Sequence, residues 1–176
     1  MPIFLSAPEA NEHAPYMSNY IRHVKPGSIE VVLKADQDQV ARLFASIGAE
    51  KAEYAYAPGK WTVKQTIIHC MDTERIFACR ALMIARGDQG KLPGYDHEAY
   101  AAKTLHDMRS LSELQAEWEM LRQLNLTLFQ SFNAADMTNI GNANANPLSP
   151  RAIAFIISGH ALHHMEILRE KYGLEF

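Results

Sequence analysis

The sequence predicts an all-α protein, a four-helix bundle with a long crossover between its second and third helices. Three observations support this fold class. Apolar residues recur at helical spacing in four long stretches, capping signals stand at the ends of these stretches, and no stretch shows the alternation typical of a strand. The helices are expected at about 28–48, 62–86, 110–132 and 149–173.

The length and composition are those of one globular domain, which we expect to span residues 1–176. A chain of 176 residues with 48% hydrophobic and 21% charged residues can bury a sizeable core. The net charge of −3 and the lack of a Lys/Arg cluster argue against nucleic acid or an anionic membrane as a partner. No apolar run has the length of a transmembrane helix, and the opening residues lack a signal-peptide pattern, so we expect a cytoplasmic protein.

The two cysteines, Cys70 and Cys79, fall nine residues apart in the second predicted helix. This spacing places them about 13 Å apart along the helix axis and on opposite sides, too far for a disulfide. Unpaired cysteines fit a reducing compartment, and we expect both to be small core residues.

The first part of the chain divides into a lead-in and a helix. Residues 1–27 contain four prolines and no sustained period, so we expect an irregular lead-in that wraps the domain, with at most a short turn of helix near 16–22. The first long helix should begin at Ser28 and stop at Gly48. Its apolar stripe comprises Ile29, Val32, Leu33, Val40, Leu43, Phe44 and Ile47.

This stripe is interrupted at Asp36 and Gln37. A polar residue at that point either faces inward toward a buried polar site or lies where the helix turns toward solvent for one turn. The second alternative is favoured.

The second helix follows a loop at 49–61 that contains a Pro-Gly turn. Thr62 and Gln65 form a capping box, and the helix should stop at Gly87. Its main apolar face comprises Val63, Ile67, Cys70, Met71, Phe77, Ala78, Ala81, Leu82 and Ile84. His69 lies at the edge of this face, so spacing alone makes it a surface or boundary residue.

The crossover, residues 87–109, is too long for a plain turn, and we expect it to hold a short helix near 97–103 and to cover a site. Ser110 and Glu113 form a second capping box, which opens the third helix. The apolar stripe of that helix comprises Leu111, Leu114, Trp118, Leu121, Leu124, Leu128 and Phe132. Residues 134–149, in which Asn alternates with Ala, should form the last loop.

The fourth helix carries the most informative pattern. Ser149 is a good N-cap, and Gly173 supplies a left-handed stop. The apolar stripe comprises Ile153, Ile156, Ile157, His160, His164, Ile167 and Leu168. His160 and His164 lie one turn apart, so their Nε2 atoms could bind the same metal ion. Alternatively, each histidine could be a core residue with a backbone hydrogen-bond partner. His163 lies about 80° from the centre of the stripe and is the less suitable ligand.

Two common kinds of metal site are excluded by their sequence signatures. Di-iron bundles use Glu-x-x-His and zinc proteases use His-Glu-x-x-His, and neither occurs in this sequence. A nitrogen-rich site for a single ion remains, and it needs at least one more ligand.

Three segments resemble the DinB/YfiT-like superfamily: WTVKQTIIHCMDTERIFACRALMIARG, LPGYDHEAY and NPLSPRAIAFIISGHALHHMEILREKYG. The resemblance runs from about Tyr54 to Tyr172. It implies that His69 joins His160 and His164 in binding one divalent metal ion, and that the protein forms a dimer. Members of this family include thiol transferases and thiol-dependent isomerases.

Such a site would have a definite chemistry. Three neutral imidazoles leave a zinc, nickel or iron ion its full charge and an open position for water or substrate. The ion can lower the pKa of water toward 7 or hold a thiol as its thiolate. The first hypothesis is therefore a thiol-dependent S-transferase that uses a low-molecular-weight thiol and a small-molecule substrate, with metal-assisted hydrolysis or isomerisation as the variant. Asp72, about a turn from His69, is a candidate catalytic base or hydrogen-bond acceptor, or simply a solvated carboxylate.

The alternative function is a non-enzymatic bundle in which the metal locks two helices together, as a structural or interaction module. A closed coordination sphere would favour it. The sequence offers no obvious fourth protein ligand, although His97 and His106 of the crossover are candidates.

The outer side of the fourth helix predicts association. Phe155, Leu162 and Met165 lie about 120° to 200° from the centre of the stripe, where a surface helix should be polar. The small residues Ser158 and Gly159 beside them would allow close approach. Either the N-terminal segment or a second copy of the chain could cover this face, and we expect a homodimer.

Overall fold

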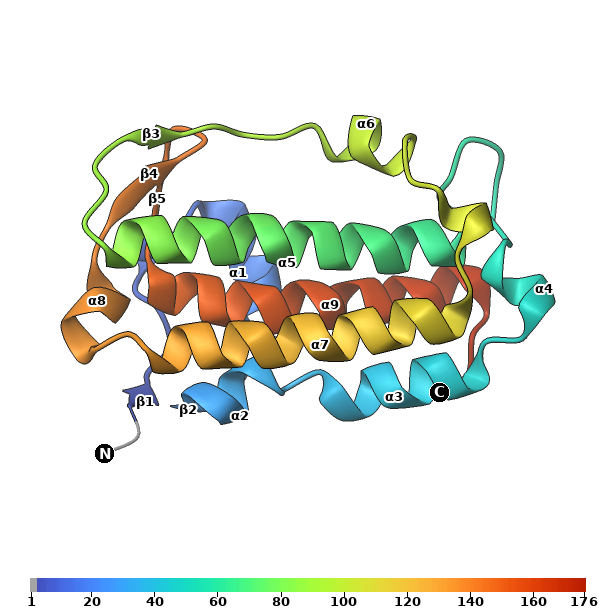
Figure 1. Ribbon diagram of the computed structural model, residues 1–176, viewed down its shortest axis with the longest axis horizontal. Helices are drawn as coiled ribbons and strands as arrows, with labels where there is room; N and C mark the ends of the chain where they lie inside the picture. The colour runs from blue at the N-terminus through green and yellow to red at the C-terminus, as the bar shows by residue number, and fades with distance from the viewer. Residues whose placement is uncertain (1–2) are drawn as a thin grey trace.

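The protein is mostly helical, and the computed structural model describes residues 3–176 (Figure 1). The bundle is built from α2 (Ile29–Leu33), α3 (Gln37–Ser46), α5 (Val63–Ala85), α7 (Leu111–Gln130) and α9 (Pro150–Tyr172). The shorter helices are α1 (Ser18–Ile21), α4 (Ala49–Ala52), α6 (His97–Ala101) and α8 (Ala134–Thr138), with 3-10 turns η1 (Ala10–Glu12), η2 (Pro15–Met17) and η3 (His106–Met108). The strands are β1 (Phe4–Leu5), β2 (Gly27–Ser28), β3 (Lys91–Leu92), β4 (Gly141–Ala143) and β5 (Asn146–Leu148).

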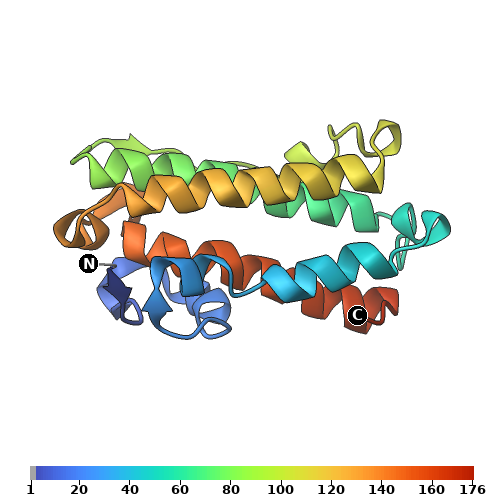
Figure 2. The same ribbon diagram turned by 60° about the horizontal axis from the view of Figure 1, so that its bottom comes forward.

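Four helical segments run side by side along the molecule: α2 with α3, α5, α7 and α9 (Figure 1). Figure 2 shows α5 and α7 together in one layer and α9 with α2 and α3 in the other. The predicted bundle is therefore confirmed in outline, with two small sheets that the sequence did not predict. Within residues 3–176, no helix is long and apolar enough to cross a membrane.

Helices α5, α7 and α9 begin where local sequence signals predict, and α9 also ends there. Thr62 and Ser110 each accept a hydrogen bond from the backbone N–H three residues on, which closes the two capping boxes. Ser149 does the same for α9. Gly173 has a left-handed backbone, φ 64°, and ends that helix.

A buried polar layer lies between the two hydrophobic clusters of the core. At its centre the Arg122 guanidinium donates hydrogen bonds to the carboxylates of Asp36 and Glu74. The Asn125 amide also donates to Glu74, and Ser158 Oγ lies 3.5 Å from Arg122 Nη1. Every helical segment of the bundle thus contributes to the layer, and the buried charge of the arginine is paired with carboxylates on two sides.

The first predicted helix, 28–48, is two helices, because the chain is interrupted where Asp36 turns inward. The Asp36 side chain lies between α2 and α3 and is fully buried, so the favoured alternative of a turn toward solvent is wrong. Burial raises the pKa of Asp36, and the charge of Arg122 opposes that rise. The expected stop near Gly48 is correct, because α3 ends at Ser46 with Ile47 as its C-cap, although Gly48 has φ −76° and not a left-handed backbone.

Some residues predicted to face the core are exposed. Leu82 of α5 is 39% exposed and Leu124 of α7 is 68% exposed. The cause on α7 is the polar layer, since Arg122 occupies an inward position that an apolar stripe assigns to leucine. Neither cysteine forms a disulfide, as expected, but only Cys70 is a core residue, because Cys79 is exposed.

A short hairpin, β4 with β5, lies in the loop before α9, where no strand was expected. Asn144 and Ala145 have φ of 53° and 60°, as a two-residue hairpin turn requires. The crossover joins this hairpin, since β3 pairs in parallel with β4 and Lys91 lies opposite Asn142. Gly94 allows a close approach, because a Cβ there would lie 2.6 Å from Asn144 Oδ1. Strands of two or three residues are too short for alternation to reveal.

The N-terminal segment, residues 3–28, covers the outer face of α9 through α1. Gly159 makes this contact possible, because a Cβ there would lie 2.1 Å from the backbone oxygen of Tyr20. The three apolar residues that suggested a dimer are buried within the chain: Phe155, Leu162 and Met165, at 0%, 7% and 2% exposure. The chain itself covers them, so this face gives no support to the predicted homodimer.

Candidate metal centre

Three histidines from two helices converge at one point. His160 and His164 lie one turn apart on α9, and His69 lies on α5. His160 Nε2 is 3.2 Å from His69 Nε2 and 3.1 Å from His164 Nε2. The structure thus brings together the three histidines that the family resemblance names. His69 is 7% exposed, so the surface or boundary position suggested by spacing is wrong.

Burial keeps these imidazoles neutral. Desolvation, and then the neighbouring histidines, lower the pKa of His69 to about 4 and that of His164 to about 3. The pKa of His160, the most deeply placed of the three, is lowered well below its ordinary value for the same reasons. A neutral imidazole presents a lone pair, which is the form that ligates a metal.

Aromatic side chains hold the three rings in place. The Trp61 indole packs 4.6 Å from the His69 ring and 6.5 Å from the His164 ring, centre to centre. The Tyr20 ring of α1 meets His160 edge to face at 5.2 Å. The helix that covers α9 therefore also fixes one member of the histidine cluster.

The nitrogen atoms fit a transition-metal ion. Ligands at two corners of a tetrahedron with metal–nitrogen bonds of about 2.0–2.1 Å lie roughly 3.3–3.4 Å apart. The observed separations, 3.2 Å and 3.1 Å, are close to that value. Mutual hydrogen bonds are the poorer solution, because a neutral His160 Nε2 has one N–H or one lone pair and faces two neighbours.

The cluster opens into a cavity of about 510 Å³. Two helical stripes form its walls, with His69, Thr73, Phe77 and Arg80 on α5 and Ile156, His160, His163 and His164 on α9. The remaining lining residues come from the N-terminal segment, the crossover, the hairpin and the turn before α5: Tyr16, Met17, Tyr20, Gly94, Tyr95, His97, Ala143, Asn144 and Trp61. A small molecule in this cavity would lie against the side chains of the three histidines.

Asp72, the candidate catalytic residue, does not line this cavity. It lines a separate hollow and forms an ion pair with Arg75, at 3.3 Å between Nη1 and Oδ1. Burial raises the pKa of its carboxyl, and the charge of Arg75 opposes that rise. Its position gives no support to a role as base or as hydrogen-bond acceptor for His69.

The other histidines differ in their distance from the cluster. His97 lines the cavity with its side chain exposed, and its ring centre lies 5.8 Å from that of His69. His106 pairs instead with Glu53, at 2.9 Å. His163 turns toward His23 and Glu166, and these three side chains form a separate group of possible metal ligands. The placement of His163 agrees with its predicted exclusion from the histidine stripe.

Arg80 and Tyr95 are among the cavity residues that sequence reasoning missed. The Tyr95 hydroxyl lies 2.7 Å from Thr73 Oγ1, which ties the crossover to α5. Helical spacing contained a signal for Arg80, because steps of four, four and three residues from His69 lead to Thr73, Phe77 and Arg80. The crossover residue had no such signal, since a loop has no period.

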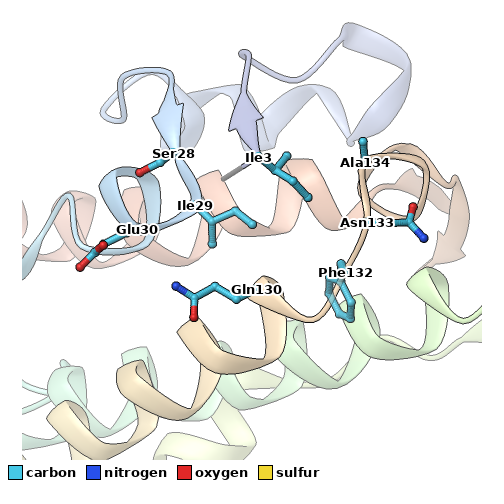
Figure 3. Close-up of a pocket in the computed structure, with 8 residues that line it drawn as sticks. All are labelled: Ile3, Ser28, Ile29, Glu30, Gln130, Phe132, Asn133 and Ala134. Atoms are coloured by element: carbon cyan, nitrogen blue, oxygen red, sulfur yellow. The ribbon is translucent and has the colours of Figure 1, made fainter. Parts of the chain in front are cut away.

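A second hollow, of about 550 Å³, lies between the N-terminal strands and the end of α7 (Figure 3). Figure 3 shows Ile3 and Ile29 facing Gln130 and Phe132 across it. Its one titratable lining residue is Glu30, which is paired with Lys34 at 2.7 Å. The hollow contains no histidine or cysteine, and its Ser28 hydroxyl is engaged as the N-cap of α2, so the histidine cavity is the better candidate site.

Comparisons with known proteins bear on this site. Residues 33–168 match the family model of the DinB superfamily. Among solved structures, the fold is similar to that of YfiT from Bacillus subtilis, with a TM-score of 0.72 and 14% sequence identity over 96% of this chain and 94% of that one. YfiT is described as a probable metal-dependent hydrolase with an unusual four-helix bundle topology. No curated protein matches the sequence.

Proposed function

Because this chain belongs to the DinB superfamily, we propose that it is an enzyme dependent on one divalent transition-metal ion held by His69, His160 and His164. Zinc, nickel and iron all suit a site of three imidazoles. One observation carries the proposal: the Nε2 atom of neutral His160 lies at tetrahedral spacing from those of neutral His69 and His164, on the wall of a cavity that can hold a small molecule.

The ion would supply Lewis acidity, which makes a nucleophile of water or a thiol at neutral pH. The chain supplies the setting for that chemistry. Trp61, Phe77 and Ile156 give the cavity apolar walls, and the neutral histidines contribute no charge of their own. Among the described lining residues there is no carboxylate, so the proposal assigns no Asp or Glu as a base.

The preferred reaction is transfer involving a low-molecular-weight thiol, and metal-assisted hydrolysis is the variant. In both reactions the nucleophile must lose one proton, so a nearby group must accept this proton and release it to solvent. His97 is suited to that task, because its exposed ring stands 5.8 Å from the ring of His69. YfiT, with its description as a probable metal-dependent hydrolase, lends some weight to the hydrolytic variant.

The non-enzymatic alternative is a metal ion that only ties α5 to α9. A structural ion is usually enclosed by four protein ligands, and three ligands beside a cavity favour catalysis instead. The two functions differ in what removal of the metal would do.

The test compares metal-free and reloaded protein. The purified protein would be stripped with a chelator, reloaded with zinc, nickel or iron, and assayed both for thiol transfer to small electrophiles and for hydrolysis of small esters and amides. An enzyme should lose turnover without the metal and regain it on reloading, while circular dichroism reports unchanged helix content. Loss of thermal stability with no turnover under any metal would instead favour the structural role.

A further inference from the structure

Two arginines of the described chain are deeply buried, and their surroundings differ. Arg80 and Arg122 are each 7% exposed. Arg122 lies between the carboxylates of Asp36 and Glu74. The arginine ion pairs within residues 3–176 engage Arg75, Arg109, Arg122 and Arg151, and none engages Arg80. Arg80 is thus a buried cation for which the described residues provide no carboxylate.

The contacts of Arg80 leave much of its hydrogen-bonding capacity for a ligand. Its Nη2 donates to the backbone oxygen of Pro93 at 2.6 Å, and its guanidinium lies over the rings of Phe77, at 5.2 Å, and Tyr95, at 6.0 Å. A guanidinium carries five N–H donors in a planar fork. The contact with Pro93 fixes the fork against the crossover and uses one of its nitrogen atoms.

The groups around Arg80 do not offset its charge at neutral pH. Its titratable neighbours are Tyr95, Tyr16 and Cys79, and burial lowers the pKa of the guanidinium itself. Phenols and thiols of ordinary acidity are uncharged at pH 7. A buried charge without a counter-ion is costly, and natural proteins pair such charges or use them to bind a ligand.

Arg80 faces the same cavity as the histidine cluster. It lies eleven residues beyond His69 on the cavity stripe of α5, which corresponds to about 16 Å along the helix axis. The cavity therefore has three neutral nitrogen ligands toward one end and a guanidinium toward the other. Tyr95 and Thr73 lie between the two ends.

We propose that Arg80 binds an oxyanion of the substrate, a carboxylate or a phosphate, at the end of the cavity remote from the three histidines. A planar fork of donors matches the paired oxygen atoms of these groups. The substrate class is thus a small acid whose reacting group lies at the other end of the molecule. Its orientation toward the histidines rests on the proposed function, whereas the oxyanion subsite rests on Arg80 and its surroundings alone.

The test measures oxyanion binding with and without metal. Isothermal titration and thermal unfolding would be run with succinate and with inorganic phosphate, against chloride at matched ionic strength. We expect one oxyanion to bind the wild type, and Arg80→Gln to bind it at least about tenfold more weakly. Arg86→Gln, which removes an exposed arginine outside the cavity, should bind it normally. Succinate binding would indicate a carboxylic acid substrate, and phosphate binding a phosphate ester.

A second measurement covers the case in which Arg80→Gln fails to fold. The Nε–H resonances of the wild-type arginines, with Arg80→Lys for assignment, should show that the oxyanion shifts Arg80 and leaves Arg122 unmoved. The inference is overturned if neither oxyanion binds better than chloride, or if binding is equal in the Arg80 and Arg86 variants. If the wild type binds the oxyanion but holds no metal ion under any loading condition, the oxyanion subsite stands and only the metal-dependent function is rejected.

Discussion

The Nε2 atoms of His69 and His160 lie 3.2 Å apart, although 91 residues separate the two histidines in the chain. The contact exists because α5 and α9 pack along their length with these two positions facing each other. It makes the assignment of ligands testable one residue at a time.

Substitution of either histidine of the α9 pair should remove the metal. We expect His160→Ala and His164→Ala to abolish stoichiometric metal binding, because two imidazoles hold an ion far less well than three. His163→Ala is the matched control, since His163 turns toward His23 and Glu166. Elemental analysis of the purified variants checks this. A normal metal content in the His164 variant, or loss in the His163 variant alone, would show that the pair is wrong.

Loss of His69 should weaken metal binding without unfolding the protein. The apolar residues of α5 remain in His69→Ala, so the core should still form. Isothermal titration of the metal-free variant should give an affinity at least about tenfold below that of the wild type. An unchanged affinity would remove His69 from the site.

The buried polar layer should fail if its arginine is removed. Arg122→Met leaves Asp36 and Glu74 buried without their partner, and we expect unfolding to become easier by about 3–5 kcal/mol. The control is Arg75→Met, because Arg75 is a partly exposed arginine whose ion pairs should be worth about 0–1 kcal/mol. Urea unfolding at pH 7 measures both, and similar small losses would mean that the layer contributes little to stability.

The contact between Glu12 and α9 should make stability depend on acid pH. Burial alone would raise the pKa of Glu12, but hydrogen bonds from Arg151, Ser149 and the Glu9 backbone hold it below its usual value of 4.5. As pH falls, the unfolded chain therefore takes up the proton first. The stabilisation is complete above about pH 4.5 and is lost as the pH falls through the lowered pKa.

Glu12→Gln removes this dependence. We expect the variant to be less stable than the wild type by roughly 1.5–3 kcal/mol at pH 7, and the difference to shrink as the pH approaches 3. Glu175→Gln, at an exposed position, should follow the wild-type profile. Urea unfolding at a series of pH values provides the measurement. A difference that stays constant with pH would contradict an ionised Glu12 as the cause.

The close approach of α1 to α9 predicts an unusual response to alanine. A glycine-to-alanine change within a helix normally stabilises it by about 0.5–1 kcal/mol. Gly159→Ala should instead destabilise by about 1–3 kcal/mol, because the new methyl group would meet the backbone oxygen of Tyr20. Gly48→Ala is the control, since a Cβ there meets nothing within 4 Å. Urea unfolding with limited proteolysis of the N-terminal segment would detect the loss, and a stabilised Gly159 variant would argue against this packing.

Much of the fold could be read from local patterns. The caps at Thr62, Ser110 and Ser149 and the stop at Gly173 were predicted correctly, because each depends on a few neighbouring residues. Family membership was also predicted correctly, since the family model matches residues 33–168, which include most of the segments that carry the resemblance. The errors on Leu82 and Leu124 arose where apolar spacing was taken as burial without knowledge of the facing helix.

The candidate site was only half accessible to sequence reasoning. The pair on α9 follows from its spacing of four residues, but His69 lay at the edge of its helical face and needed the family resemblance. Asp72 was chosen for its proximity in sequence to His69, and the structure places it in a different hollow. Three residues along a helix turn the side chain about 60° around the axis, and that rotation places Asp72 on a different face from His69.

By itself, the sequence determined where α5, α7 and α9 begin, that the helices would form a bundle, and that two histidines share a face of the last one. These properties depend on local geometry and helical periodicity. Only the tertiary structure decided that Asp36 turns inward to Arg122, that the chain covers its own α9, and that Arg80 shares a cavity with the histidines. Each of these depends on which helices face each other and at what rotation, and no spacing within one helix contains that information.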